Sequence, residues 1–195
     1  MDKELLKRYQ VLKNKVVNRK EEFSELIAFI EKRTSWMTAP ASTRFHLCSE
    51  NGLLEHSVNV AETMIRLKDA LYPLIDDETC VIVALLHDLG KAGMPGKPQY
   101  LKNEPSDRQR RTGYPINRPY RFNNELTYLS VPLRSLYLAL PFIPLSEEEA
   151  QAIAYHDGQY VEDNRSSATK EAPLTLLLQY ADNWSSFVIE GRPEP

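Results

Sequence analysis

Apolar residues recur at helical spacing along most of this chain. In residues 3–33, Phe23, Leu26 and Ile30 fall three or four positions apart, with charged residues between them. A break near residues 17–19 divides this stretch into two predicted helices. The same spacing predicts further helices at about 53–71, 78–88, 129–140, 147–155 and 173–190. The alternation that is typical of strands is not sustained elsewhere, so we predict an all-α fold, a compact helical bundle.

Capping signals support three of these predicted helices. Asp76 precedes the helix at 78 and offers a carboxylate for its N-cap. Ser146 and Glu149 have the spacing of a capping box, in which each side chain binds the backbone amide of the other residue. Pro173 suits the first position of the last helix, where a missing amide hydrogen costs nothing.

One apolar stretch ends in an unusual way. The run from Val81 to Leu86 is followed directly by His87 and Asp88, and then by Gly90 and Lys91. An apolar run of this kind is normally buried, and burial of an imidazole and a carboxylate costs several kcal/mol unless something compensates them. A divalent metal ion would compensate both groups at once.

Two other helices carry one polar residue each on an apolar row. His56 begins a row that continues through Val60 and Met64, and Asp182 follows Leu174 and Leu178 by steps of four. The opposite row of the first helix, Glu55, Asn59, Glu62 and Arg66, is expected to face water. Each inward residue has a simpler explanation, because a core histidine can bind a backbone carbonyl and an aspartate can pair with an arginine.

Taken together, His56, His87, Asp88 and Asp182 offer two imidazoles and two carboxylates. Such a set suits a borderline or hard divalent ion that keeps open coordination positions. Manganese, iron, cobalt, nickel, zinc and magnesium all remain compatible with it.

Composition and charge narrow the class of protein. With 195 residues, 42% of them hydrophobic and 26% charged, the chain can form one domain with a real core, and we expect a single domain over 1–195 with a helical N-terminal extension at 1–37. A net charge of -3 argues against a general nucleic-acid coat or a membrane-surface role. No apolar run reaches 18 residues, no secretory signal is visible, and Cys48 and Cys80 form no motif, so we expect a cytoplasmic protein.

Residues 92–124 differ in character from the rest. They are rich in Pro, Gly and Tyr, and we expect a long irregular segment. Their seven cationic residues exceed the two acidic ones, Glu104 and Asp107, by +5; the seven are Lys97, Lys102, Arg108, Arg110, Arg111, Arg118 and Arg121. The segment either folds over the candidate site and supplies cations and tyrosine rings to a nucleotide, or it is a solvated surface loop.

The ordered motifs resemble a known family. The segments LLEHS at 53–57, LLHDLGK at 85–91 and YADN at 180–183 are similar to those of the HD-domain superfamily of metal-dependent phosphohydrolases. The resemblance covers roughly 38–190, and its opening and the AIAYHDG segment at 152–158 are similar to phage and bacterial HD-domain proteins and to the HD domain of bacterial 3'-5' exoribonucleases.

The resemblance implies a role for particular residues. It implies an all-helical HD-domain fold, hydrolysis of phosphate esters or anhydrides, and His56, His87, Asp88 and Asp182 as metal ligands. Lys91 is then expected to meet a phosphate oxygen, with Asp157 and His156 as further catalytic candidates. The expected substrate-binding residues are Arg44, His46, Lys91, Arg118 and Arg121. Residues 128–135 lack the additional histidine that many relatives carry in this region, so we expect one metal ion and doubt a second.

Three functions remain open at this point. The first is hydrolysis of a nucleotide or another small phosphorylated molecule. The second is cleavage of single-stranded nucleic acid, with the basic segment as a stacking platform. The third is a non-catalytic protein that binds a metal or a nucleotide. The leading helix could also serve a homodimer.

Overall fold

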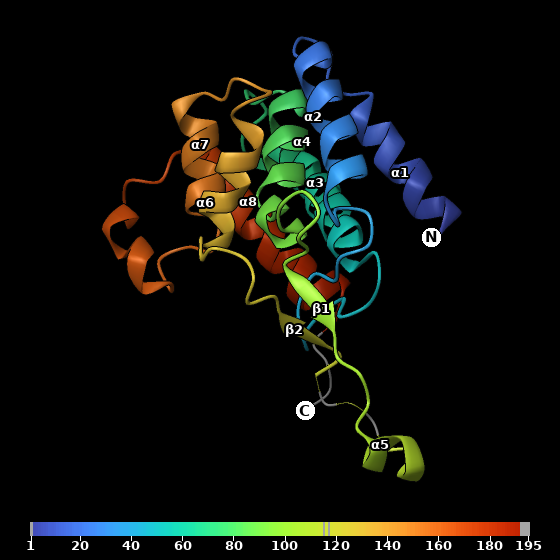
Figure 1. Cartoon of the computed structure of the whole chain (residues 1–195). Helices are drawn as coiled ribbons and strands as arrows, with labels where there is room; N and C mark the ends of the chain where they lie inside the picture. Colours follow the sequence, from blue (N-terminus) through green and yellow to red (C-terminus); the bar gives the residue numbers. More distant parts are fainter. Residues whose placement is uncertain (1, 115, 117, 192–195) are drawn as a thin grey trace.

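The computed structural model describes residues 2–114, 116 and 118–191, and these residues are mainly helical (Figure 1). The α-helices are α1 (Lys3–Lys13), α2 (Lys20–Arg33), α3 (Gly52–Leu71), α4 (Asp77–Leu86), α5 (Asp107–Thr112), α6 (Val131–Ala139), α7 (Glu147–Ala154) and α8 (Pro173–Trp184). Two short 3₁₀ helices are η1 (Leu89–Ala92) and η2 (Glu162–Ser167), and a π-helical turn, η3 (Ser185–Ile189), extends α8. The predicted all-α bundle is confirmed, apart from one small hairpin.

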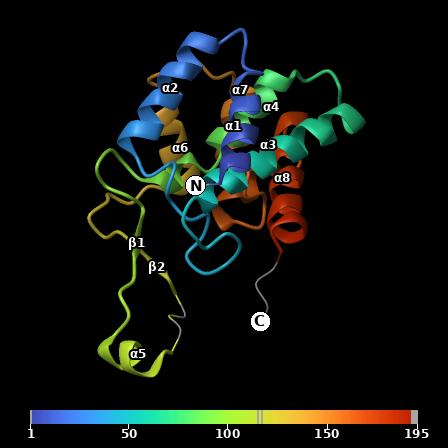
Figure 2. The same ribbon diagram turned by 90° about the vertical axis from the view of Figure 1, so that its right-hand side faces the viewer.

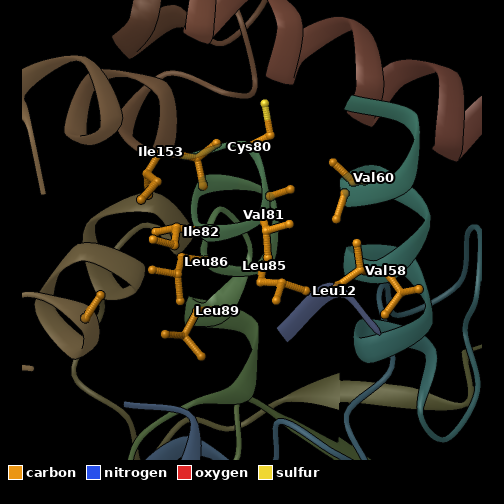
Figure 3. Close-up of a cluster of buried hydrophobic side chains, with 14 of the residues drawn as sticks. Leu12, Val58, Val60, Cys80, Val81, Ile82, Leu85, Leu86, Leu89 and Ile153 are labelled. Atoms are coloured by element: carbon orange, nitrogen blue, oxygen red, sulfur yellow. The ribbon is translucent and has the colours of Figure 1, made fainter. Parts of the chain in front are cut away.

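Helix α4 lies at the centre of the bundle. Every side chain from Cys80 to Leu86 is fully buried, which explains why this helix has no polar row. Helices α3, α6, α7 and α8 all pack against it. Figure 3 shows the result, with Val60 of α3 on one side of α4 and Ile153 of α7 on the other. The buried central helix therefore ends directly at the His87–Asp88 pair.

The N-terminal helices α1 and α2 cover one side of this core. The predicted break between them is confirmed, and Glu78 at the start of α4 accounts for its position. The Glu78 carboxylate accepts hydrogen bonds from the backbone amides of Val17 and Asn18, both at 2.7 Å. The turn between α1 and α2 is thus tied to the central helix. The role of α1 in a homodimer stays a prediction. The single domain over 1–195 also stays a prediction, and residues 1 and 192–195 of that range lie outside the described part of the chain.

The basic segment is more ordered than predicted. Strands β1 (Tyr100–Lys102) and β2 (Tyr120–Phe122) pair antiparallel, and α5 lies between them with its own capping box. The prediction of an irregular segment is therefore wrong for these elements, although it stands untested at residues 115 and 117, which lie outside the described residues. Strands of three residues are too short to show an alternating pattern in the sequence.

The hairpin extends from one end of the bundle and carries α5 at its far end (Figure 2). Its base is held by Arg134 of α6, which is 2% exposed and donates hydrogen bonds to the Gln99 side chain and to the Thr127 carbonyl. Within the described residues, no helix combines the length and the apolar character that crossing a membrane requires.

Candidate metal centre

His87 and Asp88 occupy the turn between α4 and η1. His87 caps α4, and its ring Nδ1 lies 2.7 Å from the carbonyl oxygen of Ala84. Ser135 of α6 fixes the turn, because its hydroxyl donates to the His87 carbonyl and accepts from the Gly90 amide. A side chain at Gly90 would meet the Val131 carbonyl oxygen at 2.2 Å, so glycine is what lets α6 approach this closely.

Helices α3 and α8 bring His56 and Asp182 to the same place. His56 Nε2 lies 3.2 Å from Asp182 Oδ1 and 3.6 Å from Asp88 Oδ2, while His87 Nε2 lies 3.5 Å from Asp88 Oδ2. The structure therefore brings the four predicted ligands together from three helices. Their role as ligands stays a prediction.

His156 joins these four residues from the end of α7. Its Nδ1 lies 2.9 Å from the Ile153 carbonyl oxygen, and its Nε2 lies 3.5 Å from Asp88 Oδ1. The imidazoles of His87 and His156 meet edge to face, with ring centroids 4.8 Å apart. Asp88 thus has a histidine beside each of its carboxylate oxygens.

The three imidazoles share one arrangement. In His56, His87 and His156, Nδ1 faces an oxygen atom of Glu190, Ala84 or Ile153, and Nε2 faces the carboxylates. An Nδ1–H donated to such an oxygen leaves a lone pair on Nε2, which is the state in which histidine binds a metal. His87 Nε2 is fully buried and has no hydrogen-bond partner among the described residues. This donor set fits a divalent cation.

The electrostatics of the cluster agree with that fit. Burial lowers the pKa of His87 to about 4, so this imidazole is neutral near pH 7. Burial also disfavours the charge on His56, but hydrogen bonds to Asp182 and Glu190 outweigh it and raise the pKa of His56 to about 10. In the same way, a hydrogen bond to Asp88 outweighs burial and raises the pKa of His156 to about 9. The carboxylates that favour these protons would equally attract a divalent cation, which displaces such protons on binding.

Lys91 stands beside the cluster on η1. Its Nζ lies 2.5 Å from Asp88 Oδ2, and its side chain keeps 19% of its surface exposed. Burial opposes the charge on Lys91, but the negative charge of Asp88 outweighs it and raises the pKa of Lys91 above its usual value. Lys91 therefore stays cationic and remains reachable from solvent.

The sequence analysis missed Glu190 and misjudged Asn59. Glu190 follows η3, its side chain is 1% exposed, and its two oxygens lie 3.0 and 3.1 Å from His56 Nδ1. Asn59 was expected to face water, but it is 5% exposed and donates to Glu190 at 3.0 Å. Two further steps of four along the row of Asp182 reach Glu190 through Ser186, so extending that row would have found it.

The remaining candidates divide into two groups. His46 lies near the centre, with its Nε2 3.8 Å from Glu190 Oε2, and the half-exposed Asp157 has Oδ1 3.7 Å from His156 Nε2. The three arginines are placed differently, and their substrate-binding role stays a prediction. Arg44 is exposed and lies over the ring of Phe45, Arg118 is exposed, and Arg121 lies opposite Leu101 in the hairpin.

Three overlapping groups of metal-binding side chains occur among the described residues. They are His56 with His87 and Asp182, His87 with Asp88 and His156, and His46 with His56 and Glu190; within each group the candidate ligand atoms lie within 4.8 Å of one another. All four histidines of the chain take part.

Comparison with known proteins adds one positive finding. No curated protein and no solved structure matched the chain. A family model described as the HD domain matched residues 53–186, which contain His56, His87, Asp88, His156 and Asp182. HD domains bind divalent metals and form a superfamily of metal-dependent phosphohydrolases. Because the match covers well over half of the chain, this protein belongs to the HD-domain family.

Proposed function

We propose that this HD-domain protein is a metal-dependent phosphohydrolase that acts on a nucleotide or another small phosphorylated molecule. The observation that carries the proposal is the convergence of three Nε2 atoms on two carboxylates, with the buried Nε2 of His87 left without a hydrogen-bond partner among the described residues. A cluster of this kind is costly to bury unless a cation occupies it.

The residues suited to hold the ion are His56, His87, Asp88 and Asp182. We propose one ion, with His156 beside it; the mixed nitrogen and oxygen donors suit manganese, iron, cobalt, nickel or zinc more than magnesium, which prefers oxygen ligands. When bound, such an ion lowers the pKa of a water molecule and polarises a phosphoryl oxygen.

The chain's own residues then bind and orient the substrate. Lys91 offers a compact cation to a non-bridging phosphate oxygen, and its contact with Asp88 places that cation at the edge of the centre. Asp157 is half exposed beside His156, so its carboxylate can accept a proton from the attacking water and return it to the leaving group. His46 closes the far side of His56, with ring centroids 5.1 Å apart.

Phosphate release tests the proposal. Metal-free protein would be given each of the six candidate metals and then a panel of nucleotides, cyclic nucleotides and short oligonucleotides, and the nucleotide products would be measured together with inorganic phosphate, because hydrolysis of a phosphodiester releases no inorganic phosphate. We expect metal-dependent phosphate release from at least one mononucleotide, and loss of that release when a chelator is added. Stoichiometric metal binding without turnover of any phosphate ester would contradict the proposal and favour a non-catalytic metal- or nucleotide-binding protein.

A second function is favoured by one observation. The exposed Arg108, Arg110 and Arg111 lie on the tip helix α5, Arg118 precedes β2 and Arg121 lies within it, so the part of the hairpin that extends from the bundle carries five cationic residues. Single-stranded nucleic acid is a polyanion that could bind these cations. Cleavage of oligonucleotides with a steep salt dependence, and none of mononucleotides, would favour a nuclease.

A further inference from the structure

The hairpin forms one wall of a cavity of about 280 Å³. The hairpin contributes Tyr100, Lys102 and Tyr120 to the lining, and the loop after α2 contributes Thr38 and Pro40. The cavity is small for a ligand site, since pockets for drug-sized ligands start near 300 Å³. It therefore suits one planar ring system.

The strand register explains why Tyr100 and Tyr120 both line this cavity. Lys102 pairs with Tyr120 and Tyr100 pairs with Phe122, and cross-strand partners share a face of the sheet. These side chains consequently lie on one face, whereas Leu101 and its partner Arg121 lie on the other. Only 7% of Tyr120 is exposed, so its ring is held in place.

One residue of the cavity wall is hydrogen-bonded to the neighbour of the candidate phosphate-binding residue. Ser35, which also lines the cavity, donates from its amide and its hydroxyl to the carbonyl of Ala92, the residue after Lys91. Burial raises the pKa of Tyr100, and the charges of Lys91 and Asp88 act on the same hydroxyl. Tyr100 therefore lines the cavity within electrostatic range of Lys91 and Asp88.

We propose that this cavity binds the base of a nucleoside phosphate whose phosphate group meets Lys91. Tyrosine rings stack on any base, because every base has a π face. Lys102 and Glu50 form an ion pair at 3.2 Å on the cavity wall and offer a donor and an acceptor to the edge of the base. The position of the phosphate rests on the proposed function, but binding of the base itself does not.

Binding of three small probes tests this proposal without any turnover. Adenosine supplies a base without phosphate, ribose 5-phosphate supplies phosphate without a base, and adenosine 5'-monophosphate supplies both. Tyr100→Leu should weaken adenosine and adenosine 5'-monophosphate by roughly tenfold, the scale of one lost stacking contact. Lys91→Ala should instead weaken ribose 5-phosphate and adenosine 5'-monophosphate. The matched control is Tyr160→Leu, at a tyrosine that is 98% exposed, which should bind all three probes as the wild type does.

The outcomes separate this inference from the proposed function. Adenosine that fails to bind, or that binds Tyr100→Leu and the wild type equally, overturns the base site even if phosphate release is observed. Tyrosine-dependent adenosine binding without phosphate release from any substrate upholds the base site and removes the proposed activity. Tyr100→Phe keeps the ring and should keep adenosine affinity, whereas a loss equal to that of Tyr100→Leu would contradict stacking. If a trinucleotide binds more tightly than the mononucleotide and Tyr100→Leu removes that difference, the bound base belongs to the end of a nucleic-acid strand, which overturns the assignment to a free nucleoside phosphate.

Discussion

Helix α4 has buried ionisable residues at both of its ends, and their hydrogen-bond partners differ between the two ends. At the first turn, Glu78 is 5% exposed and accepts hydrogen bonds from three successive backbone amides and from the Arg19 side chain. Arg19 also binds both carboxylate oxygens of Glu149, at 2.7 and 2.9 Å. At the other end, His87 and Asp88 lie in a cluster in which the Nε2 atoms of three imidazoles face the carboxylate oxygens of Asp88 and Asp182.

The difference lies in how well each end satisfies its own polar atoms. Around Glu78, amide and guanidinium donors surround two carboxylates, so no further ligand is needed. Around His87, three imidazoles and two carboxylates converge, and the Nε2 of His87 has no hydrogen-bond partner among the described residues. A buried polar cluster that satisfies itself is structural, whereas one that gathers carboxylates around an unsatisfied histidine nitrogen indicates a cation.

The largest expected effect comes from Asp88→Ala at the His87 end. This change removes the carboxylate that contacts His87, His156 and Lys91 together. Since loss of residues that only support metal ligands already costs about 10- to 100-fold, we expect bound metal and phosphate release to fall at least about 100-fold. Elemental analysis and phosphate release would be measured on the same preparation. A variant that stays active without metal would refute the assignment of the centre.

Arg19→Ala makes the opposite test at the Glu78 end. It leaves two buried carboxylates without their shared cation, and we expect the free energy of unfolding to fall by about 3 kcal/mol, the lower end for a broken buried ion pair. Chemical denaturation would measure that loss, and metal binding by the folded fraction should be unchanged. Weakened metal affinity in the folded protein would mean that the two ends are not independent.

Sequence patterns identified the helices but not most of the polar partners. Spacing within one helix is local, so the apolar rows of His56 and Asp182 could be recognised, and the family resemblance joined them to His87 and Asp88. Partners far apart in the chain leave no local pattern. Glu190 and His56 are 134 residues apart, and Arg19 and Glu149 are 130 apart. The hairpin escaped prediction because its strands have three residues each and depend on Arg134 of α6.

A smaller effect is expected from Glu190→Gln, which tests whether Glu190 supports the metal centre. Gln removes the charge that holds a proton on His56 Nδ1, and so lowers the basicity of Nε2 toward a metal. We expect metal affinity to weaken about 10- to 100-fold, and the metal-free protein to lose stability as well, because Glu190 there pairs with the charged His56. Titration with the metal alone would measure it. Glu62→Gln is the matched control, because Glu62 lines the same cavity as Glu190 but pairs with Arg8. An equal loss in both variants would point to a general electrostatic effect.

The smallest expected effect is the pH dependence of the Glu78 end. Burial raises the pKa of Glu78, but backbone hydrogen bonds and Arg19 outweigh it and hold the pKa below its usual value. A carboxylate with a lowered pKa stabilises the fold above its unfolded-state pKa of about 4.3, and that stabilisation is lost as the pH falls through the folded-state value. Glu78→Gln should therefore cost about 1 to 2 kcal/mol at pH 7, the scale of a lost charged hydrogen bond, and progressively less below about pH 4.

Urea denaturation of the metal-free protein from pH 7 to pH 3 would measure this difference between wild type and Glu78→Gln. The control Glu147→Gln removes an exposed carboxylate from the first turn of α7, the same turn that Glu78 occupies in α4, and so reports the shared effects of net charge and helix dipole. A cost of Glu78→Gln that stays constant down to pH 3 would show that shape, and not charge, secures this end of α4. A cost that disappears on acidification would establish that the Glu78 end is held by charge that the protein compensates itself, in contrast to the His87 end, where the proposed metal ion would do so.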